Sequence, residues 1–283
     1  MKCLVINLDR SPDRLVHMIA EFARIGTAFE RIAAVDARSH PELAQQPQHP
    51  IYGVRRLLGS EIACLHSHRA CWSILACDEA RYGAIFEDDV VFSANAGPLL
   101  ADDGWIPADA DIIKLETYFR RTLIHRRSIS AGHGFSTSRL YKNHPGTGGY
   151  IISRQAALDL LEATEKINVT ADDLIFTPAL RSSSSKKIYQ LVPALCVQDQ
   201  FVGNRLPSLL GRERDALCAV DELAVKRKRP ATARILKEAG RIQRWIVDFC
   251  RFRRHIVVPF DSTGQTSRPL DGSLAAPLPS VAL

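Results

Sequence analysis

The sequence has no uncharged run of about 18 apolar residues, so it offers no segment that could cross a membrane as a helix. After Met1, the apolar run Cys3–Ile6 stops at Asn7 and Asp9, which is too early for the hydrophobic region of a signal peptide. The seven cysteines include no C-x-x-C pair, and a chain of 283 residues can bury a core without disulfide staples. We therefore expect a globular, cytoplasmic protein with reduced thiols.

The pattern closest to a metal-binding cluster is the segment from Cys64 to Cys71, which includes His66 and His68. Helical spacing would place Cys64, His68 and Cys71 on one face of a helix. Structural zinc sites, however, usually combine pairs of ligands from separated segments. We therefore favour small buried thiols in a packed helix over a zinc site, and we keep the histidines as second-tier functional candidates.

The formal net charge of +6 is concentrated near the C-terminus. Between Arg212 and Arg254, thirteen Lys and Arg residues stand against six Asp and Glu residues, so the rest of the chain is close to neutral. Trp245, Phe249 and Phe252 lie on a helical stripe that arginines flank. Such a basic, aromatic-rich amphipathic helix suits an anionic membrane surface. Packing against the main domain or against a second subunit explains the pattern equally well.

Strand-like apolar runs alternate with helical patterns along most of the chain, which predicts an α/β fold with a mostly parallel sheet between helices. We expect a main domain over residues 1–210, a basic helical appendage over residues 211–260 and a disordered tail over residues 261–283. Within the main domain, residues 37–56 are rich in Pro, Gln and His and predict a loop or lid. Residues 123–141 predict a hairpin or meander.

Three consecutive carboxylates, Glu87, Asp88 and Asp89, follow the apolar strand-like run Gly83–Phe86. Ionised carboxylates in such a place repel one another and resist desolvation unless a cation, hydrogen bonds or solvent offsets the cost. The alternation of extended chain puts Glu87 and Asp89 on one side, where they could hold one hard divalent ion. A solvated strand end would explain a bare acidic triplet as well.

Other polar residues are expected at the same edge of the sheet. Asn7 and Asp36 also follow strand-like runs, and ligands of parallel α/β sheets gather beyond the carboxyl ends of the strands. Arg14 lies near the start of the first predicted helix, where anions are favoured, although capping and surface arginines account for this turn equally well. The shared edge favours a ligand-binding role for the triplet over a solvated strand end.

Two later segments carry further candidates. Three glycines between Gly146 and Gly149 precede a strand-like run, and their spacing matches neither a P-loop nor a dinucleotide fingerprint. They indicate close approach of the backbone to a ligand or to a neighbouring strand. Asp172 and Asp173 precede an apolar helical run. One of them can cap the helix, which leaves the other free to act.

Six segments of the chain form a recognisable series when they are taken together and in order. They are Val5–Arg10 with Arg14, Phe29–Asp36, Glu61–His68, Phe86–Val90, Gly146–Ser153 and the pair Asp172 and Asp173. Each is a weak signal alone, but in register they resemble glycosyltransferase family 25. This family includes bacterial lipooligosaccharide galactosyltransferases and the collagen galactosyltransferases.

The resemblance implies a GT-A-like fold, a UDP-hexose donor such as UDP-galactose, a glycan or glycolipid acceptor of lipooligosaccharide type, and inversion at the anomeric carbon. It also implies that Asp89 and Glu87 hold Mn²⁺ or Mg²⁺ against the diphosphate. With the strand-end positions, it suggests donor binding by Asn7, Arg14, Asp36, Glu87, Asp88 and Lys114, base catalysis by Asp173 or Asp172, and acceptor binding by His68, Gly146, Thr147 and Tyr150.

Several alternatives stay open from the sequence. The segment after the last strand offers only Gln198 and Asp199 where a histidine would complete a metal shell. A non-catalytic domain that binds a nucleotide sugar or a glycan is one alternative, and a nucleic-acid-binding tail is another. We expect no nucleic acid, because the aromatic residues of the tail follow a helical stripe. We expect peripheral association with the inner face of the membrane, and a homodimer is a further alternative.

Overall fold

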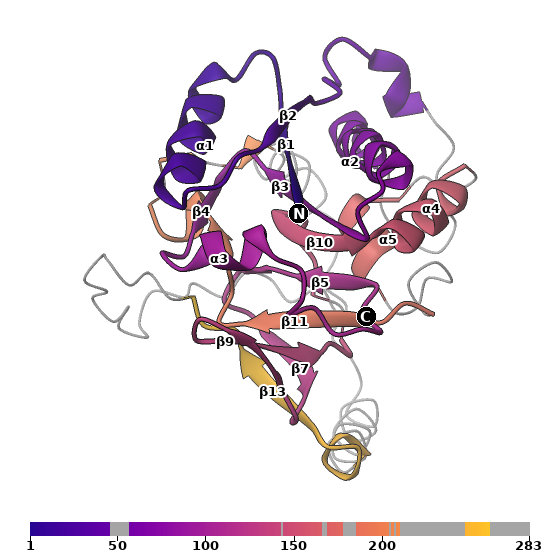
Figure 1. The fold of residues 1–283 in the computed structure, drawn as a ribbon. Helices are drawn as coiled ribbons and strands as arrows, with labels where there is room; N and C mark the ends of the chain where they lie inside the picture. Colours follow the sequence, from indigo (N-terminus) through magenta and orange to yellow (C-terminus); the bar gives the residue numbers. More distant parts are fainter. Residues whose placement is uncertain are drawn as a thin grey trace, which may run out of the picture.

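The computed structural model describes residues 1–45, 57–142, 144–165, 169–177, 185–203, 205–206, 208–209 and 247–260. Its centre is an eight-stranded sheet (Figure 1). In spatial order the strands are β2 (Glu30–Ala33), β1 (Lys2–Asn7), β3 (Tyr82–Glu87), β10 (Gly149–Ser153), β5 (Ile112–Lys114), β11 (Ile188–Val192), β9 (Phe135–Arg139) and β8 (Ile129–Gly132). Only β10 and β9 run against the other strands of this sheet. The predicted α/β fold with a mostly parallel sheet is confirmed.

Helices cover both faces of the sheet, as Figure 1 shows. The helices α1 (Pro12–Arg24) and α3 (Ala96–Ala101) pack on one face. The helices α2 (Gly59–Cys77), α4 (Arg154–Ala163) and α5 (Ala171–Phe176) pack on the other. The sheet therefore separates two hydrophobic cores.

Alternate residues of the central strands supply these two cores. In β1, Val5 belongs to the core that contains Phe22 of α1, whereas its neighbour Leu4 belongs to the core that contains Trp72 of α2. All four side chains are at most 1% exposed. Burying an apolar side chain of this size stabilises the fold by about 1.5–3 kcal/mol. Strands buried on both faces explain why the sequence shows continuous apolar runs instead of strict alternation.

Helix α2 begins at Gly59. The side chain of Glu61 accepts a hydrogen bond from the backbone N–H of Leu58 at 3.0 Å, which satisfies one of the free donors at the helix start. The helix runs to Cys77 and carries His68 on the face that packs against the sheet. In this way α2 delivers polar side chains to the edge where β3 ends.

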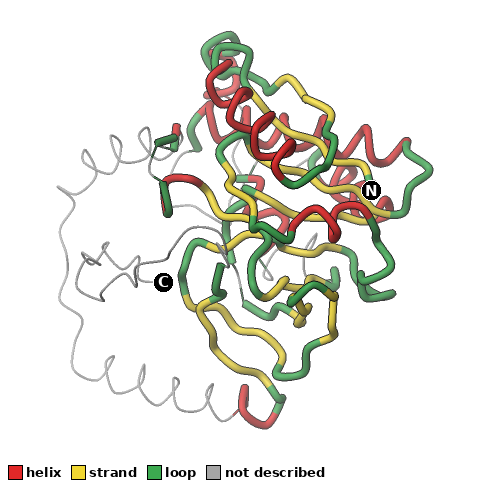
Figure 2. Tube along the Cα trace, turned by 60° about the vertical axis from the view of Figure 1, so that its left-hand side comes forward, coloured by secondary structure: helices red, strands yellow, loops and turns green. Residues whose placement is uncertain are grey.

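Two smaller sheets complete the described part of the chain. One contains β4 (Val90–Phe92), β12 (Cys196–Gln198) and β6 (Glu116–Thr117). The other pairs β7 (Arg121–His125) with β13 (Arg253–Val257). Figure 2 shows these strands at the end of the molecule away from the helices that cover the large sheet, beside the short helical segment at residues 247–250. Short 3₁₀ helices lie at η1 (Pro41–Gln45) and η3 (Asp199–Phe201). The meander predicted near residues 123–141 corresponds to β7, β8 and β9.

Strand β13 corrects one expectation. The helical appendage was expected to extend to residue 260, but Arg253–Val257 pairs antiparallel with β7. The ring of Tyr141 lies 3.9 Å from the guanidinium carbon of Arg253 and stabilises this pairing by a cation–π contact. Val258 then reaches the core with no exposed surface. The end of the expected appendage is therefore a strand of the main domain, because its packing partner favours extended chain over helix.

Other expectations fall outside the described residues: positions 46–56 of the predicted lid, the basic segment 211–246 and the tail 261–283. The division of the chain at residue 210 stays a prediction. None of the six cysteines in the described ranges forms a disulfide. Among the described helices, none combines the length and the hydropathy that spanning a membrane requires.

Candidate active site

The strands β1, β2 and β3 point the same way, and a pocket lies beyond their carboxyl ends and against α2. A parallel arrangement brings the residues after each strand to one edge of the sheet. The structure therefore gathers most of the predicted donor and metal residues. The lining includes Arg14, Asp36, His68, Glu87, Asp88 and Asp89.

The acidic triplet does not continue as extended chain. β3 ends at Glu87, Asp88 and Asp89 form a turn, and β4 begins at Val90. The expectation that strand alternation separates Asp88 from the other two carboxylates is therefore wrong. Because the chain turns here, all three side chains line the same pocket.

Asp88 is held by buried partners. Its Oδ1 lies 2.5 Å from Nη1 of Arg14, and its Oδ2 accepts a hydrogen bond of 2.7 Å from Nδ2 of Asn7. Asn7 also donates to the backbone oxygen of Ser11 at 3.0 Å and accepts from Nε of Arg31 at 3.0 Å. The structure thus places Asn7 behind Asp88 as a support, instead of in the pocket wall.

Asp89 is the least satisfied member of the triplet. It is 4% exposed, and its Oδ2 lies 3.4 Å from Nη2 of Arg14. Its Oδ1 is buried and has no hydrogen-bond partner among the described residues. Burial, and then the charge of Glu87, raise the pKa of Asp89 to about 8. A buried carboxylate oxygen without a donor is a natural point of attachment for a cation.

Glu87 is held in place from two sides. Its Oε1 accepts a hydrogen bond of 2.6 Å from the hydroxyl of Thr147, and its Oε2 accepts one of 3.2 Å from the amide of Gln198. Burial alone would raise the pKa of Glu87, but His68 and then Thr147 outweigh it and lower the pKa overall. Glu87 therefore keeps a negative charge in the pocket.

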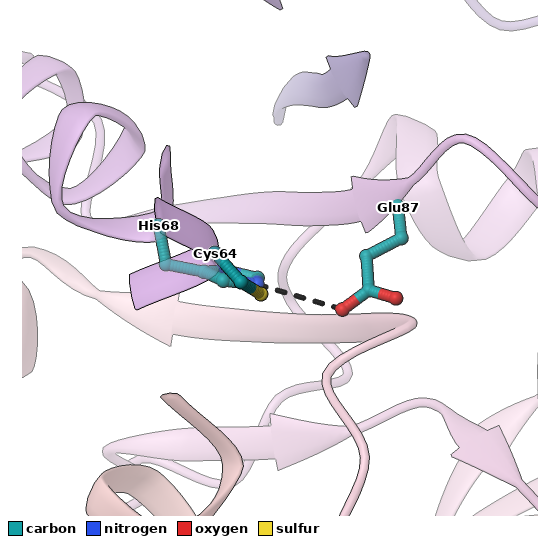
Figure 3. Close-up of side chains that lie close together, drawn as sticks. All are labelled: Cys64, His68 and Glu87. Carbon is teal, nitrogen blue, oxygen red and sulfur yellow. Dashed lines mark ion pairs between the residues drawn. The ribbon is translucent and has the colours of Figure 1, made fainter. Parts of the chain in front are cut away.

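His68 connects Glu87 to the protein core. Its Nε2 lies 3.6 Å from Oε1 of Glu87 (Figure 3). Its Nδ1 lies 2.9 Å from the hydroxyl of Tyr150. The same hydroxyl accepts a hydrogen bond of 2.9 Å from Nε1 of Trp72. Tyr150 has no exposed surface, so it positions His68 and does not reach the pocket as an acceptor-binding residue would.

Lys114 is enclosed and does not line the pocket. Its Nζ lies 2.7 Å from Oε1 of Glu116 and donates to the backbone oxygens of Pro145 at 3.2 Å and Gly146 at 2.6 Å. The ring of Phe176 lies 4.2 Å away. All three ammonium hydrogens have partners, so a direct contact with the donor does not fit this geometry. Lys114 instead fixes the loop before β10.

The loop before β10 requires glycine at two of its positions. Gly146 has a φ of 99°, and a Cβ at this position would stand 2.5 Å from Oε1 of Glu116. A Cβ at Gly148 would stand 2.5 Å from Oε2 of the same side chain. The glycines were expected to let the backbone come close to a ligand or to a neighbouring strand. In the structure, the backbone comes close to the side chain of Glu116. This close approach lets Thr147, between the two glycines, reach Glu87.

The two aspartates of α5 have different surroundings. Thr170 is the N-cap, so neither aspartate takes the cap position itself. Asp173 accepts hydrogen bonds from the hydroxyls of Thr170 at 2.7 Å and Thr177 at 2.9 Å, which ties it to its own helix. Asp172 instead accepts a hydrogen bond of 3.4 Å from the backbone N–H of Gly146. Asp172 is therefore the aspartate that contacts the loop beside the triplet.

Asp36 lies at the outer wall of the pocket. Its Oδ2 lies 2.5 Å from Nε of Arg10, and its Oδ1 accepts a hydrogen bond of 3.0 Å from the backbone N–H of Arg38. Burial raises the pKa of this carboxyl, but the N–H of Arg38 and the charge of Arg10 outweigh burial and lower it. Its place in the pocket agrees with the expectation, and its contact with a nucleoside stays a prediction.

Two buried acids near the triplet were not among the predicted site residues, although Asp199 was noted as a residue that could stand near a metal shell. Glu116 is 2% exposed and pairs with Lys114. Asp199 has no exposed surface, and its backbone N–H donates to the backbone oxygen of Asp89 at 2.7 Å. The spacing of Lys114 and Glu116 by two residues in a strand was the available signal, because it puts both side chains on one face.

Comparison with known proteins places the chain in a family. The description "Glycosyltransferase family 25 (LPS biosynthesis protein)" matches residues 1–175, which is more than half of the chain and includes the whole pocket edge formed by β1, β2 and β3. The chain belongs to glycosyltransferase family 25. The resemblance drawn from six short segments is therefore confirmed.

Named relatives of this family 25 glycosyltransferase are bacterial. It is 30% identical over 220 residues to the lacto-N-neotetraose biosynthesis glycosyltransferase LgtE of Neisseria gonorrhoeae, which covers 74% of this chain and 79% of the relative. It is 27% identical over 267 residues to the lipooligosaccharide biosynthesis protein lic2B of Haemophilus influenzae, which covers 90% and 98%. A crystal structure of a glycosyltransferase involved in the glycosylation of the major capsid of PBCV-1 aligns with a TM-score of 0.42 at 8% identity, over 77% of this chain and 98% of that one.

Proposed function

We propose that this chain is an inverting galactosyltransferase that moves galactose from UDP-galactose onto a glycan acceptor of lipooligosaccharide type. Family membership and the names of the relatives support sugar transfer in lipooligosaccharide biosynthesis. One observation carries the catalytic role: Oδ1 of Asp89 is buried in a pocket at the carboxyl ends of parallel strands, and it has no hydrogen-bond partner within the described ranges. A pocket of this kind suits the diphosphate of a nucleotide sugar with its cation.

The charges around the pocket support a cationic ligand. In the part of the chain that the structure describes, the four carboxylates Glu87, Asp88, Asp89 and Glu116 share the two buried cations Arg14 and Lys114. Burial raises the pKa of Glu116 and of Asp88, which supports incomplete compensation of these carboxylates. An additional cation would relieve this repulsion. The fold thus holds a negatively charged site next to the guanidinium of Arg14, which suits anionic phosphate oxygens.

These residues fit a hard divalent cation such as Mn²⁺ or Mg²⁺, which prefers oxygen ligands. Asp89 and Glu87 would hold it, because both line the pocket and the charge of Glu87 already acts strongly on Asp89. When bound, such an ion would neutralise charge on the departing diphosphate. Arg14 would bind the same phosphates from the side of α1, while Asn7 keeps Asp88 in place.

Inverting transfer also needs a base for the acceptor hydroxyl. We assign this role to Asp172, because Asp173 is occupied by the threonines of its own helix. Asp172 accepts a hydrogen bond from the backbone N–H of Gly146, and the same loop carries Thr147 to Glu87. The acceptor would then approach between α5 and the triplet.

The test is a transfer assay with a panel of UDP-hexoses and a deacylated lipooligosaccharide acceptor, with and without Mn²⁺. We expect acceptor-dependent release of UDP from UDP-galactose, and loss of this release in Asp89→Asn. Anomeric configuration of the product, read by NMR, tests inversion. Binding of UDP-galactose without transfer to any acceptor would contradict the proposal and favour a non-catalytic binding domain.

We also propose that the enzyme works in the cytoplasm on the inner face of the membrane. Phe249 and Phe252 are 54% and 61% exposed, and the exposed Arg251 and Arg254 flank them. Apolar rings beside arginines suit an anionic lipid surface. Co-sedimentation with vesicles containing phosphatidylglycerol should exceed that with neutral vesicles and fall in Phe252→Ser. Tight DNA or RNA binding without vesicle binding would contradict this proposal.

A further inference from the structure

Cys64, His68 and Glu87 bring three different metal-binding groups to one point (Figure 3). Cys64 and His68 are one turn apart on α2, and Glu87 ends β3. One ligand atom from each residue lies within 4.8 Å of the other two. The sequence pattern had grouped Cys71 with this pair, but Cys71 has no exposed surface and packs in the core. The third ligand is therefore Glu87, from a separate strand, and not Cys71.

The spacing of these atoms is close to what a tetrahedral ion requires. Zinc binds cysteine sulfur at about 2.3 Å and histidine nitrogen or carboxylate oxygen at about 2.0–2.2 Å, so its ligand atoms stand about 3.3–3.7 Å apart. Nε2 of His68 and Oε1 of Glu87 are 3.6 Å apart. A small movement of the Cys64 side chain, which is only partly buried, would complete the triangle.

His68 is already oriented for coordination through Nε2. Its Nδ1 lies 2.9 Å from the hydroxyl of Tyr150, whose oxygen has two lone pairs and can accept from both His68 and Trp72. Its Nε2 is buried and makes no hydrogen bond with any residue that the structure describes, because 3.6 Å to Glu87 is too long. Histidines that bind metal are usually fixed in this way by a partner on the other ring nitrogen.

We propose that Cys64, His68 and Glu87 form a site for a thiolate-preferring divalent ion, of which Zn²⁺ is the type. The site differs from the oxygen-ligand site at Asp89, because a cysteine thiolate selects zinc over Mn²⁺ or Mg²⁺. It has three protein ligands, and all three residues line the pocket, so its fourth position opens to that pocket. Coordination replaces the thiol proton of Cys64, which is released to solvent.

Glu87 belongs to both sites, which gives the proposal a functional consequence. Zinc bound to Glu87 would compete with the hard cation that Glu87 and Asp89 would share. Zinc should therefore suppress Mn²⁺-supported binding of UDP-galactose. This consequence rests on the proposed function, whereas the zinc site itself does not.

The test measures zinc affinity of the purified full-length protein by competition with a chromophoric chelator. Cys64→Ser and His68→Gln should each weaken zinc binding at least tenfold. Cys77→Ser is the matched control, because Cys77 is exposed at the other end of the same helix, and it should bind zinc as the unchanged protein does. Circular dichroism would check that each variant is folded.

Co²⁺ gives a second measurement that needs no turnover. In the unchanged protein it should produce a sulfur-to-cobalt charge-transfer band, and this band should be absent in Cys64→Ser and present in Cys77→Ser. Equal zinc affinity of Cys64→Ser and the unchanged protein, or a cobalt spectrum without the thiolate band, would overturn the proposal. Neither measurement uses a sugar donor. The zinc and cobalt results can therefore be interpreted even if the transferase proposal fails.

Discussion

The guanidinium of Arg14 lies 2.5 Å from Asp88 and 3.4 Å from Asp89, and both ion pairs are about nine-tenths or more buried. A buried charge that loses its partner is strongly destabilising. Arg14→Met should therefore lower the free energy of unfolding by about 3–5 kcal/mol. Adding Asp88→Asn should restore part of this loss, as denaturant unfolding would measure. A single variant as stable as the unchanged protein would show that Arg14 does not compensate the triplet.

Asp89 should make cation binding dependent on pH. With a pKa of about 8, its carboxyl is about nine-tenths protonated at pH 7 and must lose that proton to bind a cation. Binding of Mn²⁺ should release about 0.9 proton at pH 7 and about 0.1 at pH 9. Calorimetry in buffers with different ionisation enthalpies measures this number. Proton release that stays the same at both pH values would contradict the prediction.

The same carboxyl should affect the stability of the metal-free protein. Because the pKa of Asp89 is raised in the folded state from 3.8 to about 8, its stabilising contribution is complete below the lower value. This contribution is lost as the pH rises through the higher value. Asp89→Asn removes the ionisable group, so the melting temperature should gain more at pH 8 than at pH 5. Equal gains at the two pH values would indicate that Asp89 already ionises near its ordinary pKa.

Substitutions of Asp172 and of Asp173 should have different effects on the transfer rate and on stability. Asp172→Asn should lower the rate of transfer by about 10²–10⁴-fold, while binding of UDP-galactose and the melting temperature change little. Asp173→Asn weakens the start of α5, so it should cost about 0.5–2 kcal/mol of stability and keep most of the transfer rate. Transfer kinetics and thermal unfolding of both variants measure the contrast. A stable Asp173→Asn enzyme without turnover would reverse the assignment.

The strand β13 should be needed for stability. Val258 accepts a hydrogen bond of 2.8 Å from the hydroxyl of Thr117, and Pro259 accepts one of 2.7 Å from the backbone N–H of Ala194. A chain that ends after Phe252 loses both contacts and exposes the edge of β7, so it should melt several degrees lower and aggregate. A chain that ends after Phe260 is the control, because it keeps β13. Equal melting temperatures would show that β13 is dispensable.

The features that could be predicted from the sequence are those that depend on the pattern of residues within one segment. The apolar run before Glu87 predicted β3, and the residues after three parallel strands predicted the edge where the pocket lies. These features follow from periodicities that a single segment contains.

What the sequence could not supply depends on distant contacts. Lys114 looks like a phosphate ligand until Glu116 and the loop at Gly146 are seen to occupy all its donors. The preference of Arg253–Val257 for extended chain comes from β7, more than a hundred residues earlier. Asp173 is a base candidate by motif, but the threonines around it become visible as its partners only in the folded helix.

The position of β11 sets an order of events during synthesis. β11 lies between β5 and β9, so the large sheet cannot close until the ribosome has made Ile188–Val192. Until then β5 and β9 present unpaired edges, which are prone to pair with other chains. β1, β2 and β3 are complete a hundred residues earlier and can assemble their half of the sheet first. The nascent chain should therefore depend on chaperones most in the interval between these two stages.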